Sequence, residues 1–167
     1  MAAVLGAGEG AVLSHLGAAV LWKLWRRRVH GIDVLAARER RLTGVRVHRC
    51  RRLDPRDTTV RDDIPVTTVA RTLVDLSDYL TPYQLANVIH EAAFRNLYDA
   101  RATEAAIQRA NGRHHLPSLQ AAVGAHAAGS AGTKSELEDR FLAITHELGL
   151  SPPRINTKVQ DLEVDFH

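Results

Sequence analysis

Two carboxylates near the end of the sequence have the residue types and the spacing for metal chemistry. Glu138 falls in the first turn of a predicted helix, and Asp165 falls on a predicted strand whose same face carries Glu163. A helix with one carboxylate, followed by a hairpin with another, begins a core in which carboxylates hold Mg²⁺, a water and a phosphate oxygen. The alternative is structural, because a glutamate in the first helical turn favours the helix dipole without any ligand.

The elements that would position these acids are a helix and a hairpin. Thr133 followed by Glu136 has capping-box spacing, and apolar residues at helical spacing continue to Gly149, which ends the helix. Strands are predicted at 155–159 and 162–166, because the second of these, LEVDF, alternates apolar and acidic residues with a period of two.

A second candidate site is a run of positive charge. Residues 23–52 hold eleven Lys and Arg against two acids, a net charge of +9, whereas residues 133–167 carry a net charge of −3. Such asymmetry is typical of proteins that contact a polyanion, although a solvated arginine-rich surface is an equally good interpretation. The candidate phosphate contacts are Arg26, Arg27, Arg28, Arg40, Arg41, Arg51 and Arg52.

The first half of the chain predicts a helix and a small sheet. We expect a helix from about Glu9 to Trp25 and strands at 31–35 and 44–50, joined as a hairpin by the basic turn 37–42. In the second strand the valines would face a core, and Arg46, His48 and Cys50 would face away. A further strand is expected at 58–61.

Helices follow this sheet. Thr67 or Thr68 is the expected N-cap of a helix over 69–76, on which Arg71 and Asp75 are four residues apart and form a predicted surface pair. The next helices are predicted from Thr81-Pro82 onward, at 100–110 and at 116–125.

A change of composition divides the chain. The stretch AAGSAG at 127–132 is small and uncharged and predicts a linker between a module at 1–126 and a second at 133–167. The fold class expected from these elements is α+β. The chain would then combine a mixed helix and small-sheet module with an incomplete restriction-endonuclease-like α/β start.

The remaining candidates for chemistry are isolated. Cys50 is the single cysteine, so an internal disulfide is excluded, and a reducing compartment is favoured. His48 shares its strand face with Cys50 but lacks further ligands nearby, and His15 follows Ser14 without a third triad member. Glu9 interrupts the apolar start of the chain and costs about 2.5–3.5 kcal/mol in a membrane. We therefore expect a cytoplasmic protein without a membrane anchor.

Three stretches resemble one protein family. They are AAVLGAGEGAVLSHLGAAVLW at 2–22, IPVTTVARTLVDLSDYL at 64–80 and TKSELEDRFLAITHELGLSPPRINTKVQDLEVDF at 133–166. Together they resemble actinobacterial proteins that join an AbiEi-antitoxin-like region to a C-terminal Vsr-like (very-short-patch-repair) endonuclease domain of unknown function.

The resemblance implies roles for particular residues. Glu138 matches the helix acid and Asp165 the first strand acid of an Mg²⁺-dependent DNA endonuclease, with Glu163 in support. Family members begin with a winged-helix segment and continue into a second strand with a further acid. This chain therefore resembles a member truncated at both ends. We expect it to bind Mg²⁺ weakly and not to cut DNA, and plasmid cleavage that disappears in Asp165→Ala would contradict this.

Three functions remain open at this point. The chain is a remnant of a nuclease, a non-enzymatic module that binds DNA or a cognate toxin, or a fragment without activity. AbiEi-type antitoxins regulate their own transcription and neutralise a nucleotidyltransferase toxin. Salt-dependent DNA binding separates the DNA-binding functions from an inactive fragment, because neutralised phosphates make affinity fall steeply with salt.

Overall fold

The chain divides into two compact units, Met1–Ser130 and Ala131–His167, and the division falls within the expected linker at 127–132. The computed structural model describes residues 1–110, 113–127, 155–159 and 162–166. The predicted helix at 133–149 and most of the linker lie outside these residues. The first unit combines helices with a five-stranded mixed sheet, so the predicted α+β class is confirmed.

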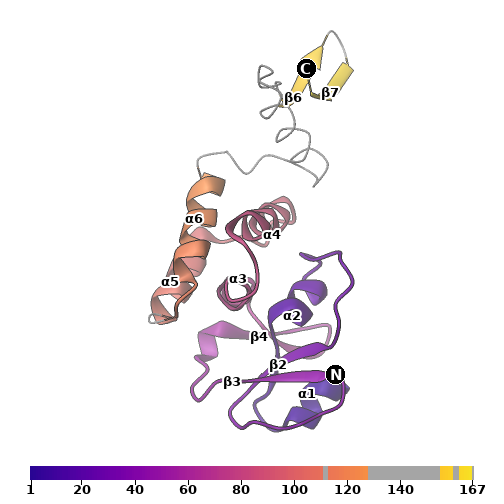
Figure 1. The fold of residues 1–167 in the computed structure, drawn as a ribbon, viewed down its shortest axis with the longest axis vertical. Helices are drawn as coiled ribbons and strands as arrows, with labels where there is room; N and C mark the ends of the chain where they lie inside the picture. Colours follow the sequence, from indigo (N-terminus) through magenta and orange to yellow (C-terminus); the bar gives the residue numbers. More distant parts are fainter. Residues whose placement is uncertain (111–112, 128–154, 160–161, 167) are drawn as a thin grey trace. The chain divides into compact units, whose positions relative to one another are not determined.

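The sheet of the first unit has the strand order β3-β2-β1-β5-β4, and Figure 1 labels its strands β2, β3 and β4. Two of its strand pairs, β1–β5 and β2–β3, are parallel, and the other two are antiparallel. The strands are β1 (Val12–Leu13), β2 (Ile32–Ala36), β3 (Val45–Arg49), β4 (Thr58–Arg61) and β5 (Ile64–Thr67).

The expected single helix from Glu9 to Trp25 is wrong. Instead α1 (Ala2–Ala7) ends at the glycine-rich stretch, β1 follows, and α2 (His15–Leu21) begins directly after β1. Gly8 and Gly10 adopt positive φ angles of 108° and 72°, a conformation that a helix interior does not allow. Glycine therefore breaks the apolar stretch into helix, turn, strand and helix.

The expected hairpin between the second and third strands is also wrong. β2 and β3 run parallel, with Ile32 opposite Val45 and Ala36 opposite Arg49. Residues 37–44 therefore return along the sheet, and the side chain of Leu42 lies 3.5 Å from the position that a Cβ on Gly6 of α1 would take. The apolar alternation predicts which side chains face inward, but it does not predict the direction of a strand.

The face assignment for β3 is confirmed. Val45 and Val47 pack against the core cluster that contains Val34 of β2. Arg46 and His48 lie on the opposite face, where both bond to Asp33.

Four helices complete the first unit. They are α3 (Val69–Leu76), α4 (Pro82–Phe94), α5 (Ala100–Arg109) and α6 (Leu116–Ala127). All four were predicted, and the Thr68 side chain caps α3 by accepting a hydrogen bond from the Arg71 N–H.

The start of α4 is also as predicted. Thr81 and Gln84 form a complete capping box there, and Pro82 occupies the first turn.

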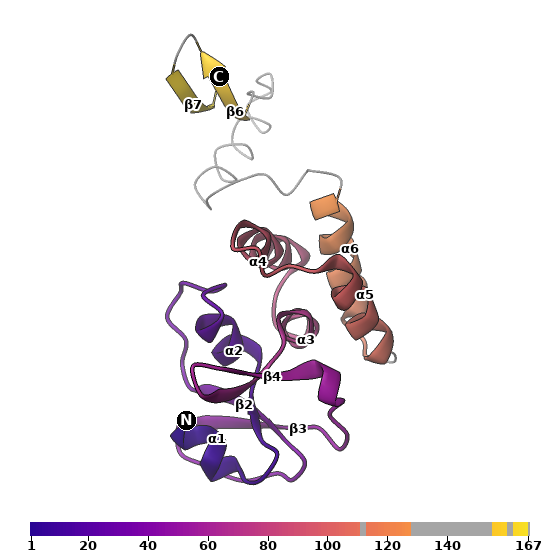
Figure 2. The same ribbon diagram turned by 180° about the vertical axis from the view of Figure 1, so that it is seen from behind.

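The helices of the first unit lie on both sides of its strands. Figures 1 and 2 draw α1 on one side, and α2, α3 and α4 on the other. Every residue of α3 is buried, which makes α3 the centre of the helical layer. No helix in the described part of the chain is long and apolar enough to cross a bilayer.

The second unit contains the predicted hairpin. β6 (Ile155–Val159) and β7 (Leu162–Phe166) pair antiparallel, with Lys158 opposite Glu163 and Thr157 opposite Val164. Positions 163 and 165 therefore both lie on a paired strand.

Candidate functional site

The predicted nuclease acids are the first candidates. Glu138 lies outside the described residues, whereas Glu163 and Asp165 lie on β7, of which the structure describes the backbone pairing. Elsewhere in the described ranges, no group of three His, Cys, Asp or Glu side chains is placed to hold a metal ion.

The predicted phosphate-binding arginines are the second candidates, and the structure exposes all seven. Arg26, Arg27 and Arg28 follow α2, Arg40 and Arg41 lie in the return segment 37–44, and Arg51 and Arg52 follow β3.

These arginines are distributed over both sides of the strands. The guanidinium of Arg26 forms an ion pair of 3.2 Å with Glu91 on α4. The guanidinium of Arg40 donates to the carbonyl of Gly6 on α1 at 3.4 Å. Because α1 and α4 lie on opposite sides of the strands in Figure 1, these two arginines face different parts of the surface.

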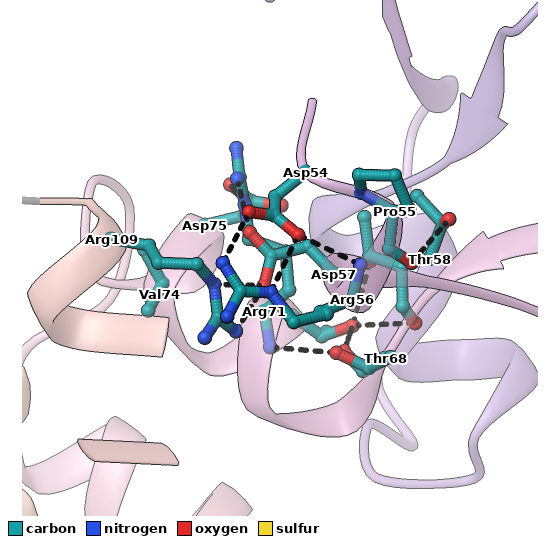
Figure 3. A network of polar contacts seen from close by, with 12 residues as sticks. Asp54, Pro55, Arg56, Asp57, Thr58, Thr68, Arg71, Val74, Asp75 and Arg109 are labelled. Carbon is teal, nitrogen blue, oxygen red and sulfur yellow. Dashed lines mark hydrogen bonds and ion pairs between the residues drawn. The ribbon is translucent and has the colours of Figure 1, made fainter. Parts of the chain in front are cut away.

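The first unit contains a buried ion-pair network, of which the sequence predicted a single pair, Arg71 with Asp75 (Figure 3). The expected surface pair of Arg71 and Asp75 forms at 2.9 Å, but both side chains are buried, so the predicted exposure is wrong. Arg71 also donates to Asp57 at 3.1 Å, and Arg109 donates to the other oxygen of Asp57. Arg113 completes the network with a 3.0 Å contact to Asp75.

The network joins segments that are distant in sequence. Asp57 ends a short 3-10 turn (Pro55–Asp57), Arg71 and Asp75 lie on α3, and Arg109 ends α5. Burial raises the pKa of Asp75 even though Arg71 and Arg113 oppose that shift, and one of its carboxylate oxygens has no hydrogen-bond partner. The arrangement is that of a structural clamp, because its acids are closed off from solvent.

A second cluster, which we call the histidine cluster, consists of Ser14, His15, Asp33, His48 and Tyr79. The imidazoles of His15 and His48 stack with their centroids 3.9 Å apart, and the Tyr79 ring meets both of them edge-on. His48 Nε2 lies 2.9 Å from the Asp33 carboxylate, and its Nδ1 lies 3.4 Å from the Tyr79 hydroxyl.

Burial controls the protonation of the histidine cluster. Burial and the neighbouring His48 together lower the pKa of His15 to about 3, so His15 is neutral at physiological pH. Burial alone would raise the pKa of Asp33, but hydrogen bonds from His48 and Arg46 outweigh it and lower that pKa. Asp33 is therefore a buried carboxylate that stays ionised and bonds to His48 and Arg46.

The chemistry available to the histidine cluster is limited by its pairing. Ser14 Oγ bonds to Nδ1 of His15 at 2.9 Å, whereas Asp33 bonds to His48. Serine and aspartate thus hold different imidazoles and do not form a triad. His15 has a positive φ of 48°, which is uncommon outside glycine, and the sequence signal for this site was the Ser14-His15 pair after a glycine-rich stretch.

The described part of the first unit also contains two hollows. An open groove of about 420 Å³ lies beside β3 and is lined by residues 39–43 with Val45 and Val47. A second hollow of about 290 Å³ lies between the starts of α3 and α5, with Trp22 in its wall. Its two arginines are Arg56 and Arg109, and both are already paired with carboxylates.

Comparisons with protein-family models, with curated proteins and with solved structures found no match.

Proposed function

We propose that this chain is a cytoplasmic DNA-binding protein of a nuclease-related, toxin–antitoxin or defence-associated family. In this proposal the arginine-rich segment 23–52 holds the DNA backbone without reading its sequence. The resemblance described above supports the family, and the exposure of the basic side chains supports the binding.

One observation carries the proposal. All eleven Lys and Arg side chains of residues 23–52 are exposed, whereas one of the two acids, Asp33, is buried and bound internally to Arg46 and His48. Glu39 is therefore the single exposed acid of the segment. The positive charge of this segment therefore lies at the surface, where it attracts phosphates. Binding to those phosphates releases their counterions.

The test is a salt titration of DNA binding. The full chain is titrated into a fluorescent duplex, and the anisotropy is followed at several salt concentrations. We expect the logarithm of the affinity to fall linearly with the logarithm of salt, by about 0.9 for each phosphate contacted, and to be the same for unrelated sequences. Binding that does not change with salt would contradict the proposal.

Single charge reversals locate the surface. Arg28→Glu, Arg41→Glu and Arg51→Glu each test one of the three arginine groups, and Arg101→Glu on α5 is the control, because Arg101 is exposed but lies outside the basic segment. A reversal at the contact surface should reduce the salt slope by about 1 and weaken binding to all sequences alike. An equal loss with Arg101→Glu would mean that total charge, rather than this segment, holds the DNA.

A second candidate function, against the expectation above that this chain does not cut DNA, is metal-dependent DNA cleavage. The antiparallel pairing of β6 with β7 supports it, because the resemblance assigns its strand acid to such a hairpin. Incubation of the chain with plasmid and Mg²⁺ or Mn²⁺ tests it. Cleavage that Asp165→Ala abolishes would favour this function, whereas intact plasmid would leave DNA binding alone.

A further inference from the structure

The outer edge of β3 presents unpaired backbone groups. Among the described strands, β3 pairs with β2 alone. The Gly44 carbonyl accepts from the Ile32 N–H, and the Cys50 N–H donates to the Ala36 carbonyl, so the even-numbered residues of this segment bond to β2. In a parallel pair these bonds alternate along the strand, so Val45, Val47 and Arg49 direct their peptide groups to the outer edge.

One of these outward groups is already used within the chain. The Val45 N–H donates to the Leu42 carbonyl at 3.2 Å. The N–H and carbonyl of Val47 therefore form the centre of the edge that a further strand would pair with.

The groove of about 420 Å³ lies beside this edge. Leu42, Val45 and Val47 supply its apolar lining, and Arg40 and Arg41 supply positive charge. Val45 and Val47 alternate with Arg46, whose side chain lies on the opposite face of the sheet, so a strand added to β3 would direct every second side chain toward this groove.

The charge near the groove selects the partner. Five arginines and one acid, Glu39, occupy residues 37–49. Arg46 bonds to Asp33 on the far face, whereas Arg49 shares the face of the valines and is exposed. An occupant with acidic side chains next to apolar ones would meet both the arginines and the apolar lining.

We propose that the outer edge of β3 and its groove bind an extended acidic peptide segment of another protein by adding it to the sheet as a strand. Main-chain hydrogen bonds to Val47 would provide affinity, and the groove with its arginines would provide preference for alternating apolar and acidic residues. This function differs from DNA binding in its main-chain contacts, because a nucleic-acid backbone has no N–H and carbonyl pair to match Val47, although Arg40 and Arg41 belong to both surfaces.

The first test changes the ligand and leaves the protein intact. A fluorescein-labelled peptide of alternating valine and glutamate is titrated with the full chain, beside the same peptide N-methylated at alternate residues and a version with lysine for glutamate. We expect both modified peptides to bind about tenfold or more weakly, because the first loses its N–H donors and the second its charge match. Equal binding of the N-methylated peptide would overturn strand addition.

The second test changes the edge. Val47→Glu should abolish peptide binding, whereas Val60→Glu, the same change at an exposed position of the opposite edge strand β4, should leave it unchanged. Circular dichroism of both variants checks the fold.

Competition with a DNA duplex identifies the other class of occupant. Displacement of the peptide by DNA, together with a loss of DNA binding in Val47→Glu, would assign the groove to nucleic acid and overturn the proposal. Peptide binding that persists at saturating DNA supports it.

Discussion

Arg71 lies between two buried carboxylates and is the central cation of the first unit. It contacts Asp57 at 3.1 Å and Asp75 at 2.9 Å, and Asp75 is 0% exposed. Sequence spacing predicted the pair with Asp75, because the two residues are four apart on a helix. It did not predict Asp57, which lies 14 residues away and reaches α3 only through the fold.

Removal of Arg71 should therefore destabilise the first unit strongly. We expect Arg71→Met to lower the free energy of unfolding by about 3–5 kcal/mol, because it leaves buried acids short of a partner. Urea denaturation measures this change. Arg56→Met is the control, since Arg56 also pairs with an aspartate but is exposed, and it should cost far less. Similar losses for both variants would contradict a buried clamp.

His15 is the other residue with an unusual setting, since it is 3% exposed and keeps a positive φ. Its neighbours include His48, Asp33, Arg113 and Asp78, of which the two acids raise and the two basic groups lower its pKa, while burial lowers it most. The sequence showed the histidine but not the stacking partner 33 positions later.

The pH dependence of stability should report on His15. Its folded pKa of about 3 lies below the ordinary 6.5, so the unfolded chain binds the proton first. The stability contributed by neutral His15 is present above pH 6.5 and is lost as pH falls toward 3. We expect His15→Asn to lessen the fall between pH 7 and 4, because asparagine tolerates the positive φ and does not titrate.

Urea denaturation at each pH measures this effect. The exposed His30 provides the matched control, because His30→Asn should leave the pH dependence as it is in the parent chain. A parent-like pH dependence in His15→Asn would contradict the role of His15.

At the scale of elements, the β4–β5 hairpin shows what the sequence concealed. Strand β4 was predicted, but β5, which contains Pro65, was not. Pro65 lies opposite Val60 in the second pair from the two-residue turn, after Arg61–Ile64, and neither residue of this second pair bonds across the hairpin. The backbone N–H that proline lacks would point toward β1. Because β1 and β5 pair at a single position, Leu13 with Val66, the missing donor is tolerated.

The turn of this hairpin can be improved. Asp62 and Asp63 both adopt positive φ, 47° and 59°, which is the geometry of a type I′ turn that favours Asn-Gly. We expect Asp62→Asn with Asp63→Gly to raise the free energy of unfolding by roughly 0.5–1 kcal/mol, as strain is relieved. Thermal denaturation measures it, and Asp63→Val should act in the opposite direction. Stabilisation by both would exclude the turn as the cause.

At the scale of the whole molecule, the sequence predicted the fold class and the helices after the sheet better than it predicted the topology of the sheet. Capping residues such as Thr68 and Thr81 act locally, so their helices were placed correctly. The parallel pairing of β2 with β3 depends on contacts between residues 37–44 and α1, which no local pattern encodes. The candidate sites show the same contrast. The charge of residues 23–52 was enough to predict the exposed arginines, whereas the histidine cluster brings together residues that are distant in sequence and could not be predicted from local patterns.

The two-residue strand β1 has a consequence for how the first unit folds. Val12 and Leu13 are the link between β2 and β5, since β1 pairs antiparallel with one and parallel with the other. The β4–β5 hairpin closes a short loop and can form early, whereas the Leu13–Val66 pairing closes a loop of more than fifty residues. We therefore expect the pairing of β1 with β5 to form later than the β4–β5 hairpin.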